Sequence, residues 1–269
     1  MKKIFYIELL KKIFVSRYFI WGSVKRDFQC TYKNSLLGAT WTVINPLSMI
    51  IVYIIIFSNV MHTRLPNTGN KFSYSIYLCA GSLPWGLFQE IITRGQNLFL
   101  LNASIIKKVN FPRISLPIIA LINSMINFVI IFILFIVFIL ILGQWPGTVF
   151  FAFFPTLLIQ IIFSIGLGMI LGILNVFFRD VGQLFSVVMQ FWFWLTPIVY
   201  PANILPDYAQ FWLKFNPMFS VINAYQTIFV NQQWPNPLSL LYPFLLGICS
   251  CAVGLHLFHK HVGEMVDEL

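Results

Sequence analysis

The sequence predicts an all-α polytopic membrane protein with six transmembrane helices, and three observations support this fold class. Hydrophobic residues make up 59% of the 269 residues and charged residues only 9%, whereas about a quarter of an ordinary soluble domain is charged. The apolar residues gather in runs long enough to cross a bilayer, which takes about 20 helical residues. The charged residues lie mainly between these runs.

The first element is expected at residues 1–20, as an amphipathic helix lying in the cytoplasmic interface of the membrane. Its apolar side would carry Ile4, Phe5, Leu9, Ile13 and Phe14. Charged residues interrupt this run and no small-residue cleavage site follows, so we expect no cleavable signal peptide. We divide the chain into a cytoplasmic interface segment (residues 1–35), a transmembrane domain (36–259) and a cytoplasmic tail (260–269).

Crossings one and two are expected at residues 43–60 and 73–92. Glu90 and Arg94 lie four residues apart at the inner end of the second crossing and can pair there, which lowers the cost of two charges near the bilayer. Between Arg113 and Arg179 there is no Asp, Glu, Lys or Arg, but the turn-forming sequence GQWPG interrupts this stretch at 143–147. The stretch therefore predicts crossings three and four, joined by a tight turn.

Small and polar residues on these two crossings predict helix contacts. Ser164, Gly168, Gly172 and Asn175 recur along one face of the fourth crossing, so that a neighbouring helix can approach closely. On the third crossing, Asn123 and Asn127 lie one turn apart and are expected to bond to neighbouring helices. We interpret both features as packing rather than transport.

Crossings five and six are expected at residues 184–200 and 238–258. The proline-rich segment 201–237 between them contains an apolar run, MFSVINAYQTIFV, that is too short and too polar to span. We therefore predict re-entrant or interfacial outer helices that close the outer end of a pore. The alternative is an amphipathic cap that rests on the membrane surface without gating.

The distribution of basic residues sets the orientation. With the N-terminus in the cytoplasm, 14 of the 17 lysines and arginines lie on inner segments. Only Arg64, Lys71 and Lys214 then lie outside. The positive-inside rule therefore places both termini in the cytoplasm.

Enzyme signatures are not found. The sequence has no GxxxxGK[ST], HExxH or GxSxG motif, so we predict no catalytic residues and no nucleotide site. His256, His259 and His261 have a spacing that a metal could use. We interpret them as interfacial side chains at the end of the sixth crossing and expect no metal site.

Four stretches carry a family resemblance: RDFQCTYKNSLLGATWTVINPL (residues 26–47), IIKKVNFPR (105–113), FFRDV (177–181) and FWLTPIVYP (193–201). In this order and at these spacings, they resemble the ABC-2 type polysaccharide export permeases. These are the Wzm-like membrane subunits of transporters for O-antigen, capsule and teichoic acid. The resemblance covers essentially the whole chain, and it implies the ABC-2, or type V, exporter fold.

The resemblance also implies partners. Two permease copies would form the channel as a homodimer, and two copies of a separate ABC subunit would bind ATP and Mg, so no cofactor is expected in this chain. The coupling element would match residues 97–113, with a short helix at 102–108. We expect the apolar members to fill a groove on the ATPase and the basic members to lie at its rim, unless the charges serve only as topology signals. The predicted coupling residues are Asn102, Ile105, Ile106, Lys107, Lys108, Phe111 and Arg113.

The implied cargo is a glycan on a polyprenyl diphosphate lipid. Lys25, Arg26 and Lys33 precede the first crossing, at the height where a diphosphate headgroup would enter. General attraction to anionic lipid is the alternative interpretation of these three residues. Arg64, in the first outer loop, is a weaker candidate on the exit side.

Aromatic rings could hold a sugar by stacking and still let it slide. Two helical faces have the spacing for this, and packing against the dimer partner is their alternative role. The predicted path residues are Asn45, Met49, Tyr53 and Phe57 on the first crossing, and Gln190, Phe193, Trp194 and Pro197 on the fifth. Trp192 is expected to contact lipid or the partner copy.

Two other functional classes fit parts of the sequence. A membrane glycosyltransferase or ligase would also handle lipid-linked sugars, but it would carry acids in its outer loops, where only Asp207 lies. An ATP-independent transporter would carry ionisable groups near the middle of the bilayer, and none is evident.

Overall fold

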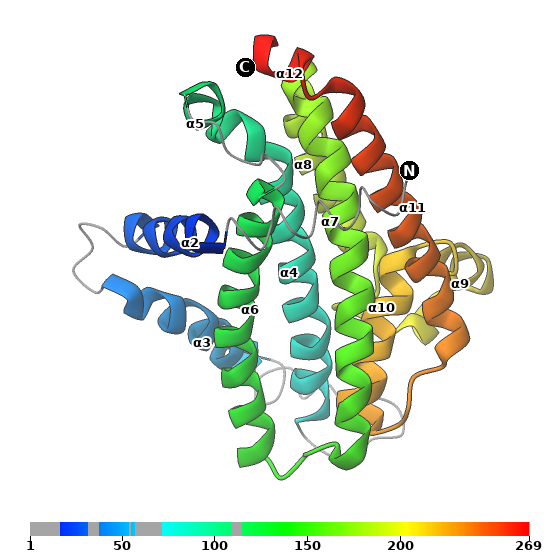
Figure 1. The fold of residues 1–269 in the computed structure, drawn as a ribbon. Helices are drawn as coiled ribbons and strands as arrows, with labels where there is room; N and C mark the ends of the chain where they lie inside the picture. Colours follow the sequence, from blue (N-terminus) through cyan, green and yellow to red (C-terminus); the bar gives the residue numbers. More distant parts are fainter. Residues whose placement is uncertain (1–16, 32–37, 54, 57–71, 109–114, 269) are drawn as a thin grey trace.

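The computed structural model describes residues 17–31, 38–53, 55–56, 72–108 and 115–268, and every regular element within them is a helix (Figure 1). This confirms the predicted all-helical class. Most of the expected interface helix at 1–20 lies outside the described residues. The helices are α2 (Arg17–Thr31), α3 (Trp41–Tyr53), α4 (Ser73–Leu101), α5 (Ala103–Lys108), α6 (Ser115–Ile141), α7 (Phe153–Phe177), α8 (Asp180–Leu195), α9 (Asp207–Leu213), α10 (Pro217–Gln226), α11 (Pro237–His261) and α12 (Glu264–Glu268).

Three of the described helices are long and apolar enough to cross a membrane: Ser115–Ile141, Gly147–Phe177 and Pro237–His261. They correspond to the third, fourth and sixth predicted crossings. The described part of the first crossing, α3, has 13 residues, which at 1.5 Å per residue spans about 20 Å of a bilayer core of about 30 Å. The count of six crossings therefore stays a prediction.

The turn predicted at 143–147 separates α6 from the 3-10 helix Gly147–Ala152, which leads into α7. Gly143 and Gly147 have φ angles of 67° and 63°. These left-handed conformations favour glycine because it has no Cβ. Local turn chemistry thus explains why this apolar stretch folds back as a helical hairpin.

The long helices α4, α6, α7 and α11 run side by side and form the body of the molecule (Figure 1). Helices α2 and α3 lie beside α6, inclined to the long helices. Helices α5 and α12 contact each other at the end of the bundle opposite the 143–147 turn. The expected coupling helix and the C-terminal helix therefore lie at the same end.

The small-residue face predicted on the fourth crossing is confirmed as the contact between α7 and α4. A Cβ atom added to Gly95 of α4 would lie 2.9 Å from the Cα of Gly168. Ser164 is fully buried, and Asn175 donates from Nδ2 to the carbonyl of Gln96 at 2.9 Å. Glycines at the crossing point thus let the two backbones meet.

Gly95→Ala should destabilise the protein by about 1–3 kcal/mol, because the new methyl group would press on the backbone of α7 and not on a flexible side chain. The measurement is thermal unfolding of the purified protein in detergent. Gly86→Ala, in the same helix, is the matched control, since a Cβ there would have no atom within 4 Å. Equal melting temperatures for the two variants would contradict the close approach of α4 and α7.

Candidate translocation path and coupling surface

Helix α8 presents three different sides. Met189 is its buried residue, and Phe185, Trp192 and Phe193 are half-buried on the same side, which faces α4 and α7. One exposed side is apolar and carries Leu184, Val187, Val188, Phe191 and Leu195. The other exposed side, the polar stripe, carries Gln183, Ser186, Gln190 and Trp194. An apolar side suits lipid or a partner, whereas a polar stripe suits a hydrated path.

The polar stripe contains two of the predicted path residues, Gln190 and Trp194. Gln183 and Ser186 extend it by two turns toward the start of α8, and the sequence reasoning missed both. Ser186 lies four residues before Gln190 and Gln183 lies three residues before Ser186, and this helical spacing was a signal that could have found them. Phe193 lies at the edge of the stripe, where its ring centroid is 5.4 Å from that of Trp194.

The prediction that Trp192 contacts lipid or the partner copy is wrong. Its ring packs edge-on against Phe88 and Phe163, with centroid distances of 5.3 and 6.4 Å. Its Nε1 donates to Oδ1 of Asn216 at 2.8 Å. The reason is that α8 packs on α4 and α7 through this side, which periodicity alone does not reveal.

Pro197 is buried and does not share the exposed side of α8. The helix ends at Leu195, so the helical spacing that grouped Pro197 with Gln190 no longer applies. The carbonyl of Pro197 instead accepts hydrogen bonds from the Tyr77 hydroxyl at 3.2 Å and from Nε2 of Gln226 at 3.1 Å. The structure thus removes Pro197 from the predicted path face.

On α3, Asn45 and Met49 are exposed, while Tyr53 is half-buried beside the core. Phe57 lies outside the described residues. Helix α3 packs on α6 and α4, and α8 packs on α7 and α4. One copy of the chain therefore does not bring the two predicted path faces together.

The short helix predicted at 102–108 is present as α5, and Nδ2 of Asn102 donates to the carbonyl of Leu98 at 2.8 Å. Ile106 does not point outward as expected. It is buried in a cluster that includes Met265 of α12 and Phe258 of α11. Ile106 therefore anchors α5 to its own chain and cannot fill a groove on a partner.

Lys107 is exposed at the predicted rim. The side chains of Ile105 and Lys108, together with Phe111 and Arg113, lie outside the part of the chain that is described. Within that part, no group of three or more His, Cys, Asp or Glu is placed to hold a metal. Nδ1 of His261 pairs with Oε2 of Glu264 at 2.6 Å.

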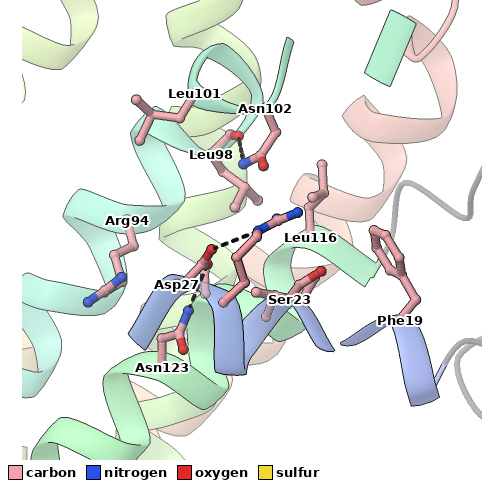
Figure 2. Close-up of a pocket in the computed structure, with 12 residues that line it drawn as sticks. Phe19, Ser23, Asp27, Arg94, Leu98, Leu101, Asn102, Leu116 and Asn123 are labelled. Atoms are coloured by element: carbon pink, nitrogen blue, oxygen red, sulfur yellow. Dashed lines mark hydrogen bonds and ion pairs between the residues drawn. The ribbon is translucent and has the colours of Figure 1, made fainter. Parts of the chain in front are cut away.

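Of the predicted headgroup residues, Lys25 and Arg26 are exposed on α2, and Lys33 is outside the described residues. Arg26 lines a small cavity of about 100 Å³ between α2, α4 and α6, which Arg94 also lines (Figure 2). Nε of Arg26 is 3.9 Å from Oδ1 of Asp27. The cationic guanidinium of Arg26 therefore lies at this cavity, beside the carboxylate of Asp27.

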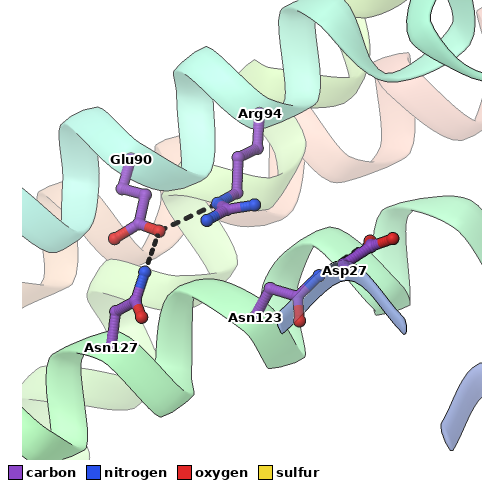
Figure 3. A network of polar contacts seen from close by, with 5 residues as sticks. All are labelled: Asp27, Glu90, Arg94, Asn123 and Asn127. Atoms are coloured by element: carbon purple, nitrogen blue, oxygen red, sulfur yellow. Dashed lines mark hydrogen bonds and ion pairs between the residues drawn. The ribbon is translucent and has the colours of Figure 1, made fainter. Parts of the chain in front are cut away.

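A polar network ties α6 to its neighbours (Figure 3). Nδ2 of Asn123 donates to Oδ2 of Asp27 on α2 at 3.1 Å, and Nδ2 of Asn127 donates to Oε1 of Glu90 on α4 at 2.8 Å. Oε1 of Glu90 also accepts from Nε of Arg94 at 2.8 Å. These contacts confirm the predicted hydrogen bonds from the Asn123 and Asn127 side chains to neighbouring helices, and the predicted ion pair between Glu90 and Arg94. The network joins α2 to α6 and α6 to α4.

The segment between α8 and α11 differs from a cap resting on a surface. Helix α9 exposes Tyr208, Phe211 and Trp212, but α10 is buried between α4, α7 and α11. Asn216 begins α10 by accepting from the backbone N–H of Met218 at 3.1 Å. The apolar run of this segment therefore belongs to the core of the bundle.

Comparisons with known proteins agree with this architecture. The family model described as "ABC-2 type transporter" matches residues 18–230. An "O-antigen export system permease protein RfbA" of Myxococcus xanthus is 31% identical over 98% of this chain and 100% of its own length. A protein of the same name from Klebsiella pneumoniae is 32% identical over 87% of this chain and 88% of its own. The "Polysialic acid transport protein KpsM" of Escherichia coli is 20% identical over 90% and 92%.

Proposed function

The chain belongs to the ABC-2 type transporter family, and from this we propose that it is the membrane permease subunit of an ATP-driven polysaccharide exporter. The cargo would be a polyprenyl-diphosphate-linked glycan, and among the possible glycans we propose O-antigen. The observation that carries the proposal is the end-to-end similarity to an O-antigen export permease. The protein would lie in the bacterial inner membrane, with both termini in the cytoplasm.

The proposed assembly is a homodimer of this chain with two ATP-binding subunits. Two features support a second copy: α8 has a broad exposed apolar side, and α3 and α8 do not meet within one copy. Two features support a separate ATPase: the sequence contains no phosphate-binding loop, and α5 exposes Lys107 at the predicted cytoplasmic end.

The proposed path runs between the two copies. A glycan would slide along Asn45 and Met49 of α3 and along the polar stripe of α8. Stacking on Trp194 would hold each sugar weakly, in a manner that tolerates different sugars. Lys25 and Arg26 would attract the diphosphate headgroup on the cytoplasmic side. Helix α10, buried in the bundle, would form part of the outer closure.

We expect the tagged chain to co-purify with a P-loop protein from its native host, and the reconstituted complex to hydrolyse ATP faster when lipid-linked polysaccharide is added. Lys107→Glu should weaken the association, because it reverses a charge at the proposed docking surface. Lys214→Glu, at an exposed lysine of the segment before α10, is the matched control. Export that proceeds fully without an ATPase would contradict the proposal and would favour an ATP-independent transporter.

A further inference from the structure

A pocket of about 260 Å³ lies between the first turns of α4, the segment after α8, and the exposed side of α10. We call it the amide pocket, because four of its lining residues are Asn203, Asn223, Gln226 and Asn231. Tyr77 and Phe219 add two aromatic rings. None of these residues belongs to the predicted path, the coupling surface or the headgroup site.

The chemistry of the amide pocket is unusual for a chain with 59% hydrophobic residues. Each primary amide both donates and accepts hydrogen bonds without carrying a charge. None of the described residues that line the pocket is acidic or basic. The pocket therefore suits a neutral ligand with several hydroxyl groups, and it suits phosphate or a metal cation poorly.

One wall of the pocket is held in place by internal hydrogen bonds. Nε2 of Gln226 donates to the carbonyl of Pro197 at 3.1 Å, and the Tyr77 hydroxyl lies 3.0 Å from the carbonyl of Tyr200. Among the described residues, the exposed side-chain amides of Asn203, Asn223 and Asn231 have no protein hydrogen-bond partner. A fixed wall with free amides around it leaves several hydrogen-bond donors and acceptors available to a ligand.

The backbone is irregular at the same place. Thr227–Asn231 form a π-helix, and Gln232 after it has a φ angle of 54°. Single-turn π-helices occur frequently at functional sites, and left-handed conformations of residues other than glycine are uncommon. Both irregularities adjoin the pocket, at the end of an otherwise regular and buried helix.

We propose that the amide pocket binds one sugar unit of the exported glycan. The free amides would bond to the hydroxyls of the sugar, and Tyr77 or Phe219 would contact its apolar face. The volume is slightly below the roughly 300–1,000 Å³ of pockets for drug-sized ligands, which suits a single monosaccharide. This inference rests on the proposed function and adds to it a hydrogen-bonding site outside the α3 and α8 faces.

The location gives the site its place in export. Tyr77 lies near the start of α4, at the end of the bundle that is predicted to be outside. The glycan would therefore reach the pocket late in its passage. Each neutral hydrogen bond contributes only about three- to tenfold to affinity, so a few of them can hold a sugar and still release it.

The first test places a photo-crosslinking phenylalanine analogue at position 219 of the full chain, expressed with its ATPase in cells that need the chain for surface polysaccharide. Illumination should give a high-mass adduct that stains as glycan. The same analogue at Phe151, an exposed residue near the 143–147 turn, is the matched control and should give none. Glycan adducts at position 151 but not at position 219 would overturn the proposal that the amide pocket binds the glycan.

The second test uses Asn223→Ala and Asn231→Ala, which should each lower the rate of export about three- to tenfold at normal membrane levels. Gln233→Ala removes an exposed amide two residues beyond Asn231, outside the pocket, and should leave export unchanged. Normal export by the double asparagine variant would overturn the inference and leave the proposed function intact. If surface polysaccharide does not depend on the chain at all, the proposed function itself fails.

Discussion

Trp192→Ala should lower the free energy of unfolding by about 2–4 kcal/mol, because it removes a large half-buried aromatic side chain, for which the loss is somewhat smaller than the roughly 3–5 kcal/mol typical of a fully buried one. The ring of Trp192 packs against Trp85, Phe88 and Phe163, so its loss would leave a cavity between three helices. The variant would also lose the hydrogen bond to Asn216, which links α8 to the start of α10. Thermal unfolding of the detergent-solubilised protein measures the effect.

Two further variants separate the loss of ring packing from the loss of the hydrogen bond to Asn216. Trp192→Phe keeps most of the packing but removes the N–H group, so it should cost only about 1 kcal/mol. Trp194→Ala removes a ring that is 61% exposed. The free energy of unfolding of this variant should therefore change by less than about 0.5 kcal/mol. Trp194→Ala should instead slow export, since this ring belongs to the polar stripe. A larger loss of stability from Trp194→Ala than from Trp192→Ala would contradict the orientation of α8.

Gln160→Leu should destabilise the protein by about 2–4 kcal/mol, because it would leave the buried Tyr225 hydroxyl without its acceptor, at about 1–3 kcal/mol, and would remove the hydrogen bond to the Pro84 carbonyl, at about 1 kcal/mol. Nε2 of Gln160 donates to the carbonyl of Pro84 at 2.6 Å, and its Oε1 accepts from the Tyr225 hydroxyl at 2.9 Å. Gln160 and Tyr225 are both fully buried. This one amide therefore joins α7 to α4 and to α10.

A double-mutant cycle tests that connection. Tyr225→Phe removes the hydroxyl that Gln160→Leu would leave without an acceptor, so the double variant should be more stable than the sum of the single effects predicts. Gln190→Leu, at an exposed amide of α8, is the matched control and should change stability by less than about 0.5 kcal/mol. Strict additivity of Gln160→Leu and Tyr225→Phe would contradict the contact.

Helix contacts that depend on local chemistry were predictable from the sequence. The turn at 143–147, the close face around Gly168 and the pair Glu90–Arg94 each depend on residues a few positions apart, and all three are present. The hydrogen bonds that the side chains of Asn123 and Asn127 make to other helices were predictable for a related reason. A polar group in an apolar helix must find a partner, although the sequence did not say that Asp27 and Glu90 would be the partners.

The errors share one physical cause. Periodicity tells which residues of a helix share a side, but it does not tell which neighbour covers that side. The directions of the side chains around α8 predict Trp192 on the outside, but α4 and α7 cover that side of the helix. Ile106 was expected to face a partner, but α12 covers it from the same chain. Helical spacing groups Pro197 with Gln190, but α8 ends at Leu195, so that spacing does not apply to Pro197.

The sequence by itself determined the membrane class, the helical hairpin and the family, because hydrophobic runs, turn formers and motifs are local properties of the chain. Tertiary structure alone decided which side of α8 is buried, that α10 is part of the core, and that Asn203 joins the amides of residues 223–231 around one pocket. These features depend on helices that are far apart in sequence and meet only through packing. Unpaired buried polar groups and exposed apolar surface both raise the free energy of an arrangement of helices. Which groups are left unpaired or exposed depends on the packing of the whole bundle, so the sequence of a single helix does not determine it.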